Sequence, residues 1–292
     1  MVRYRLSRQY LALLASLLFC LSQPAFAEQP LRLSVEQLQQ QLNSPNLVIL
    51  DSRSPEDYQQ NHIPGALNFP EVWTYIDKQI DGRIAQPARI QNLLQSLGIN
   101  TDTSLVIYDD GKMANAARVF WTLEVYGFTD VRVLDQGYDA WLDHNYPVDD
   151  LIPKTQTSNY IPTLNHDRLA TKLTTLIASK TPNQIIIDAR PNDAYKGLVS
   201  SAKRFGHIPT AINIPASHNL AEDHQLTHLK STHELNELYS FIPKKSKIII
   251  YCAIGRISAT NYLALRELGY NVANYDASWK EWGNDITLPI ER

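Results

Sequence analysis

From about residue 33 onward, short continuous apolar runs alternate with stretches in which apolar residues recur at helical spacing. Such short runs are typical of strands buried on both faces of a sheet, and the recurring positions are typical of amphipathic helices. Ser34 followed by Gln37 also resembles a capping box. The predicted strands are 47–50, 104–108, 184–188, 246–251 and 272–275, and the predicted helices are 34–42, 114–126, 168–178, 232–241 and 257–268. This alternation predicts an α/β fold in which parallel sheets carry helices on both faces.

The pattern occurs twice, with residues of the first half returning 137 to 145 positions later. The second copy has about eight extra residues between Tyr195 and His207. The matching segments are 48–53 with 185–190, 62–68 with 207–213, 105–108 with 248–251, and 134–141 with 275–282. We interpret the chain as a duplicated domain, at 33–148 and 165–292, joined by a proline-containing linker at 149–164.

The overall composition is that of an ordinary globular protein, with 44% hydrophobic and 20% charged residues. The net charge of −3 comes without a basic block, which argues against a nucleic-acid partner. Two cysteines and eight scattered histidines do not form a metal-binding pattern, and no glycine-rich phosphate loop follows a strand. We therefore predict neither a metal nor a cofactor, and the sequence carries no prediction of the oligomeric state.

The first 27 residues have the pattern of a secretory signal peptide. Three arginines precede an apolar run over 11–21, which is too short to span a bilayer, and Ala25-Phe26-Ala27 resembles a cleavage site. We predict cleavage after Ala27, a periplasmic or secreted location, and no membrane anchor in the mature chain. Cleavage would change the net charge from −3 to −6 and would leave Cys252 as the single cysteine.

A comparison of the two copies distinguishes residues with a structural role from candidates for catalysis. The pairs His62 with His207 and the Asp-x-Arg motifs at 51–53 and 188–190 occur in both copies, so we interpret them as structural. After the strand that ends at Tyr108 or Tyr251, however, the first copy has Asp109 and the second has Cys252. Only the second copy carries a nucleophile there, and we predict that the first is catalytically silent.

Cys252 is predicted to lie where a strand ends and a short loop enters a helix. Backbone N–H groups converge in such a loop, which can hold an anion and favours the thiolate form of a cysteine. Gly255 permits a tight turn, and Arg256 adds a positive charge. A buried structural cysteine is the alternative interpretation.

The Asp-x-Arg repeat, the His-Ile-Pro-x-Ala-x-Asn stretch and the Tyr-Cys-x-x-Gly loop together resemble tandem-domain rhodaneses, the thiosulfate and 3-mercaptopyruvate sulfurtransferases. The resemblance covers nearly all of 33–288. It implies two rhodanese folds, each a parallel sheet between helices, with the second one catalytic. It further implies that Cys252 accepts a sulfane sulfur as a persulfide and passes it to cyanide or a thiol.

The resemblance also suggests which residues hold the small anionic sulfur donor. Arg190 matches a substrate-contacting arginine of the family, and Arg204 resembles a basic residue that precedes the Gly-His-Ile-Pro motif. We expect thiosulfate as the donor because mercaptopyruvate is mainly a cytosolic metabolite, with 3-mercaptopyruvate as the alternative. The donor-binding loop would comprise Ala253, Ile254, Gly255, Arg256 and Ile257.

A phosphatase of the same fold needs Cys-x5-Arg, and the arginine position is occupied by Ser258. A persulfide carrier without turnover, or a binding module of rhodanese fold, remains open.

Overall fold

The computed structural model describes residues 30–76 and 81–292, and the segment Leu31–Arg292 forms one compact unit. The predicted signal peptide and Cys20 lie outside the described residues. The first copy contains β1 (Arg32–Leu33), α2 (Val35–Gln41), β2 (Leu47–Asp51), α3 (Pro55–Gln60), β3 (Leu67–Asn68), the 3₁₀ helix η1 (Glu71–Thr74), α4 (Pro87–Ser96), β4 (Ser104–Tyr108), α5 (Ala114–Val125), β5 (Val131–Leu134) and α6 (Gly137–Asp143).

The second copy repeats this order and adds a hairpin. It contains β6 (Leu169–Ala170), α7 (Lys172–Ala178), β7 (Gln184–Asp188), α8 (Asn192–Tyr195), β8 (Ile212–Asn213), the 3₁₀ helix η2 (Ala216–Asn219), β9 (Leu220–Asp223), β10 (Leu226–Leu229), α9 (Thr232–Leu238), β11 (Lys247–Tyr251), α10 (Ser258–Glu267), β12 (Asn271–Tyr275) and α11 (Ser278–Trp282). Strands β9 and β10 are antiparallel to each other.

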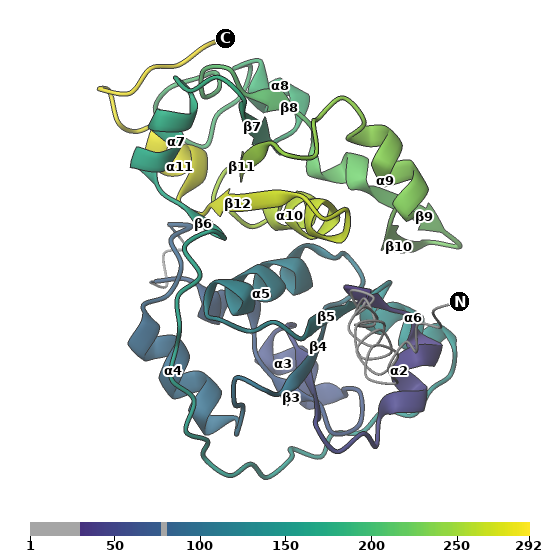
Figure 1. Cartoon of the computed structure of the whole chain (residues 1–292). Helices are drawn as coiled ribbons and strands as arrows, with labels where there is room; N and C mark the ends of the chain where they lie inside the picture. The colour runs from purple at the N-terminus through teal and green to yellow at the C-terminus, as the bar shows by residue number, and fades with distance from the viewer. Residues whose placement is uncertain (1–29, 77–80) are drawn as a thin grey trace, which may run out of the picture. The chain divides into compact units, whose positions relative to one another are not determined.

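Each copy builds one five-stranded sheet whose pairs are all parallel. The strand orders are β1-β5-β4-β2-β3 and β6-β12-β11-β7-β8, which are equivalent position by position. Helices lie on both faces of each sheet, and α5 of the first copy packs beside α10 of the second (Figure 1). The predicted α/β architecture with two parallel sheets is confirmed.

One hydrophobic core runs through the contact between the two copies. Buried residues of α4, α5, α9 and α10 belong to a single cluster, in which the rings of Phe120 and Tyr262 lie 6.3 Å apart between centroids. Separate clusters fill the outer face of each sheet, beneath α2 and α6 in the first copy and beneath α7 and α11 in the second. The two copies of the duplicated fold are therefore joined by apolar packing.

Most predicted elements occur close to their predicted positions, and the capping box of Ser34 with Gln37 is present. The prediction of a helix over 168–178 is wrong at its start. Leu169 and Ala170 form β6, which pairs with Asn274 and Tyr275 of β12, and α7 begins only after the Thr171 cap. Edge pairing thus takes two residues that local spacing had assigned to the helix.

Residues 150–164, within the predicted linker, contain no helix or strand. They nevertheless contact the first copy. The Ser158 amide donates to the Gln95 carbonyl at 3.0 Å, and the Tyr160 hydroxyl donates to the Tyr126 carbonyl at 2.7 Å. No helix among the described residues has the length and apolar character needed to cross a bilayer.

Candidate active site

Cys252 follows the C-terminal end of β11 and has only 1% of its surface exposed. Its amide donates to Ser278 Oγ at 3.1 Å, and its carbonyl accepts the Trp279 amide at 3.0 Å. Its side chain belongs to a small buried cluster with Ala189 and Ala216, against which Ile257 packs. The strand end is thereby fixed to the start of α11, and Cys252 occupies one defined position.

The loop that follows turns back at Gly255, where φ is +72°. This left-handed conformation is the turn predicted at that position, and a Cβ there would lie 2.5 Å from the Asp276 carbonyl oxygen. The Gly255 carbonyl accepts hydrogen bonds from Asn274 Nδ2 and from Arg118 Nη1, each at 3.0 Å. The loop is thereby fixed through this carbonyl to a residue of each copy.

Within the described part of the chain, the amides of residues 253–258 have no hydrogen-bond acceptor. Three to four unpaired N–H groups are expected where a helix begins, and α10 adds the positive end of its ten-residue dipole. The loop has the composition of an anion cradle, because it combines several N–H groups that lack an acceptor with the start of a helix.

The first copy shows how such a loop binds an anion, because there it is filled by its own side chain. The Asp109 carboxylate accepts the amides of Gly111 at 2.9 Å and of Met113, Asn115 and Ala116 at 3.2 Å each. Burial raises the pKa of Asp109, whereas these amides act to lower it. Cys252 leaves the corresponding space of the second copy to a ligand or to its own thiolate.

Arg190 makes the scaffold contacts that the sequence suggested for it, while its substrate contact stays a prediction. Its Nε and Nη2 bind Asp188 at 3.0 and 2.6 Å, and Nη2 also donates to the Gly206 carbonyl at 2.8 Å. The guanidinium lies over the ring of Trp279 at 4.4 Å, and the amide of this tryptophan binds the Cys252 carbonyl. Its Nη1 is buried and has no partner among the described residues. An unpaired buried guanidinium nitrogen is a ready donor for an anion.

Arg256 and Arg204 differ in how their charges are used. Arg256 is exposed at the loop, and its side chain makes no ion pair or hydrogen bond with the described residues. Arg204 is committed to backbone carbonyls, donating to Leu288 at 2.8 Å and to Trp282 at 2.9 Å. The predicted donor contact of Arg204 thus finds no support in its surroundings, whereas Arg256 is free to act.

The scaffold interpretation of the repeated residues holds. His62 stacks on Tyr58 and His207 on Tyr195, with ring centroids 3.9 Å apart in both pairs. Asp51 binds Arg53 as Asp188 binds Arg190. The described residues contain no group of three potential metal ligands.

A family profile with the description Rhodanese-like domain matches residues 34–144 and again residues 169–285. The chain belongs to this family. A thiosulfate sulfurtransferase of Corynebacterium glutamicum is 30% identical over 295 residues, covering 92% of this chain and 93% of its own. The sulfur carrier protein TtuD of Thermus thermophilus is also 30% identical, over 91% of this chain and 98% of its own.

A solved rhodanese structure agrees with the whole architecture. The crystal structure of SseA from Escherichia coli, described as a 3-mercaptopyruvate sulfotransferase, superimposes with a TM-score of 0.76 at 26% identity. The match covers 86% of this chain and 99% of SseA. The chain therefore shares the fold of SseA over nearly the whole length of that protein, including both rhodanese domains.

The sequence did not identify one residue that reaches this loop from the other rhodanese domain. Arg118 of α5 is fully buried and donates to Gly82 O at 3.1 Å and to Thr74 Oγ1 at 3.2 Å, in addition to Gly255. Its guanidinium lies 4.5 Å from the Tyr75 ring centroid. The signal that could have found it is a lone arginine within the apolar run of helix 114–126.

Asp276 completes this contact between the rhodanese domains. Its Oδ2 accepts the Ile84 amide at 2.6 Å, and its Oδ1 accepts the Ala277 amide at 2.7 Å. Burial raises its pKa, and the nearby Arg118 acts in the opposite direction. Asp276 belongs to one of the segments that occur in both copies of the sequence. Its partner in the other domain is the backbone amide of Ile84, and a contact with a backbone amide cannot be predicted from the pattern of side chains.

Proposed function

We propose that this chain is a rhodanese that moves a sulfane sulfur from thiosulfate to cyanide or a thiol through a persulfide on Cys252. Its relatives over nearly the whole chain include a protein named thiosulfate sulfurtransferase. It is a sulfurtransferase of the tandem-domain type. The identity of the sulfur donor, the persulfide intermediate on Cys252 and the identity of the acceptor are what we propose.

The observation that carries the proposal is the difference between the two equivalent loops. One is closed by the Asp109 carboxylate, and the other combines a cysteine with amides that have no acceptor among the described residues. Sulfur transfer needs a nucleophile beside an anion site, and only the second loop supplies both.

The proposed reaction has two half-reactions that balance without an outside oxidant. In the first, the Cys252 thiolate attacks the sulfane sulfur of thiosulfate. The cysteine–sulfur bond forms as the bond to the sulfonate sulfur breaks, and sulfite leaves with the electron pair. In the second, the cyanide carbon attacks the outer sulfur, thiocyanate leaves, and the thiolate is restored. With a thiol acceptor, the product is the acceptor's persulfide.

The surrounding residues supply charge and position. The amides of 253–258 face the anionic end of the donor, where preorganised N–H groups stabilise developing negative charge. Arg190 offers its unpaired Nη1, and Arg256 adds a solvent-facing cation. Arg118 and Asp276 position the loop from outside, because neither has a free polar atom directed to a ligand.

We also propose that residues 1–27 are a signal peptide and that the mature enzyme acts in the periplasm or outside the cell. Export places the enzyme away from cytosolic mercaptopyruvate, which favours thiosulfate as donor. 3-Mercaptopyruvate remains the alternative because SseA, which shares the fold, is described as a 3-mercaptopyruvate enzyme.

Thiocyanate formation by the mature chain, beginning at Glu28, tests the proposal. Thiosulfate and 3-mercaptopyruvate are compared with cyanide as acceptor, using Cys252→Ser as the matched control. We expect saturable multiple turnover that the variant lacks while its circular dichroism spectrum is unchanged. Transfer retained in Cys252→Ser would disprove the assignment of the nucleophile.

A carrier without turnover is the second candidate, because one relative is named a sulfur carrier protein. Mass spectrometry of the chain after incubation with thiosulfate separates the two. One stoichiometric persulfide on Cys252 without continued thiocyanate release would favour the carrier. Neither turnover nor a persulfide would leave only a binding protein of rhodanese fold.

A further inference from the structure

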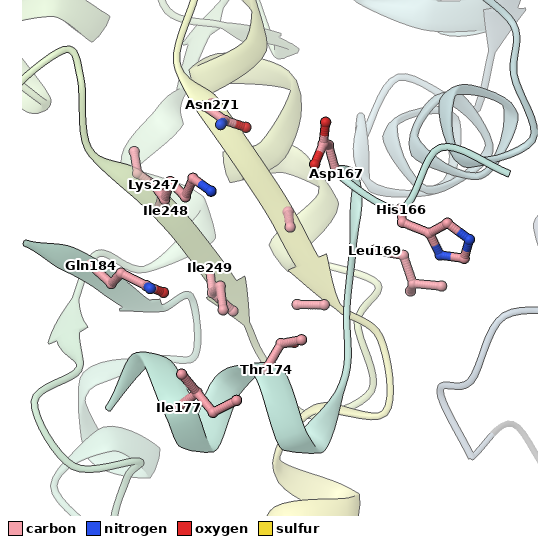
Figure 2. A pocket seen from close by; sticks show the side chains of 12 residues that line it. His166, Asp167, Leu169, Thr174, Ile177, Gln184, Lys247, Ile248, Ile249 and Asn271 are labelled. Atoms are coloured by element: carbon pink, nitrogen blue, oxygen red, sulfur yellow. The ribbon is translucent and has the colours of Figure 1, made fainter. Parts of the chain in front are cut away.

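A trough of about 260 Å³ opens in the second rhodanese domain, between α7, β6 and the N-terminal ends of β7, β11 and β12 (Figure 2). Cys252 follows the opposite, C-terminal end of β11. The trough is therefore separate from the proposed sulfur-transfer site, and the function described above does not use it.

The first domain fills the same place with one of its own side chains. Arg132 pairs with Val106 in the register of β5 with β4, and Ala273 pairs with Ile249 in the equivalent register of β12 with β11. Arg132 Nη2 donates to Ser104 Oγ at 2.9 Å, and its Nε lies 3.7 Å from Asp130 Oδ1. In the second domain, the short side chain of Ala273 stands at the position of Arg132. The space that the arginine side chain fills in the first domain is left open here and forms the trough.

The residues at the walls of the trough also differ from the residues at the equivalent positions of the first domain. Lys247 takes the strand position that Ser104 has in the first domain, since they pair with Gln184 and Leu47, respectively. Ile177 of α7 is 51% exposed at the rim, and Ile249 lies beneath it as part of the floor. An aliphatic ligand would cover this apolar surface.

Opposite charges flank the apolar floor. Lys247 lies on β11 and Asp167 on the segment before β6, with β12 between them (Figure 2). Within the described chain, neither side chain makes an ion pair or a hydrogen bond. The internal cation of the first domain is thus replaced by an open site with one free ammonium and one free carboxylate.

We propose that this trough binds a small ω-amino acid, an aliphatic zwitterion with its two charges at the ends of a short chain. Its carboxylate would pair with Lys247 and its ammonium with Asp167, and its methylene chain would cover Ala273 and Ile249. The volume is slightly below the usual range for pockets that hold drug-sized ligands, which suits a molecule of this size.

NMR titration of the mature chain with 6-aminohexanoate tests the proposal, with hexanoate and hexylammonium as probes that each lack one charge. We expect saturable shifts of the amides around Lys247 and Ala273, with at least tenfold weaker binding of either singly charged probe. No saturation by 6-aminohexanoate, or equal affinity for all three probes, would overturn the proposal.

Two variants provide independent checks. Ala273→Arg copies the first domain and should abolish binding, with sulfur transfer from Cys252 unchanged as proof of folding. Lys247→Gln should weaken binding at least tenfold, whereas Lys196→Gln, at another exposed lysine, should not. Binding retained in Ala273→Arg or unaffected by Lys247→Gln would contradict the assigned site. Because sulfur transfer is measured separately, failure here does not bear on the proposed enzyme activity.

Discussion

Gly255→Ala is the sharpest test of how the Cys252 loop is held. The chain offers a matched control in Gly269→Ala, because Gly269 has φ +75° and Gly255 has φ +72°. An added Cβ meets nothing within 4 Å at Gly269, whereas at Gly255 it meets backbone atoms of Asp276 at 2.5 and 2.7 Å. The two variants share the conformational strain and differ only in the steric overlap.

The magnitudes follow from these distances. A left-handed non-glycine residue costs roughly 1–2 kcal/mol, which both variants bear. For ordinary contact at 3.4 Å, the Cβ at residue 255 must move about 0.9 Å from the Asp276 oxygen. Asp276 is itself fixed by the Ile84 and Ala277 amides, so the loop has to move instead. A displacement of about 1 Å at a catalytic site can lower the rate about 100-fold.

The assay is thiocyanate formation with saturating donor, accompanied by urea unfolding to measure stability. We expect Gly269→Ala to lose roughly 1–2 kcal/mol of stability and to keep its kcat within about twofold. Gly255→Ala should lose more stability and about 100-fold in kcat. If Gly255→Ala retains the kcat of Gly269→Ala, the loop is not held rigidly and our account of the cradle is wrong.

Three further predictions concern charged side chains. Arg256→Ala should raise the donor KM with little change in stability, and an unchanged KM would remove Arg256 from the site. Arg204→Ala should lower the free energy of unfolding by about 2 kcal/mol or more, because carbonyls of 282–288 lose a charged donor, while the donor KM stays constant; a KM increase at unchanged stability would restore the substrate role. Hydrogen bonds from Thr287 and Lys172 lower the pKa of Asp285 to about 2, so its contribution to stability exists above about pH 4 and is lost as the pH falls toward 2. Urea midpoints of the wild type and Asp285→Asn should differ at pH 6 and converge by pH 2, and a constant difference would contradict this pairing.

The sequence predicted the duplicated α/β fold and the loop with Cys252 because both depend on local patterns. Buried parallel strands appear as apolar runs, and the comparison of Asp109 with Cys252 needs only the repeat. It did not predict β6, because a two-residue edge strand has no period of its own and exists only through its pairing with β12. Nor did it predict Arg118, whose partners include carbonyl oxygens 36 and 137 residues away.

The trough at Ala273 was missed for a related reason. A small residue in a predicted strand is ordinarily interpreted as part of the packed core. Only the register of both sheets reveals that Arg132 occupies the position equivalent to Ala273. Arg204 presents the opposite case, because a resemblance in sequence suggested a ligand contact that stays a prediction. Its guanidinium binds main-chain carbonyls, and the sequence gives no sign of a carbonyl acceptor.

The contact of Arg118 with the Gly255 carbonyl has a consequence for how the duplicated chain can change. Cys252 belongs to one half, but a hydrogen-bond donor that fixes its loop belongs to the other, so the loop depends on both halves of the chain. A second half produced alone would keep Cys252 and lose this donor, together with the apolar partner of α10. The first half therefore serves as a support for the Cys252 loop, although its own loop carries Asp109 in place of a cysteine.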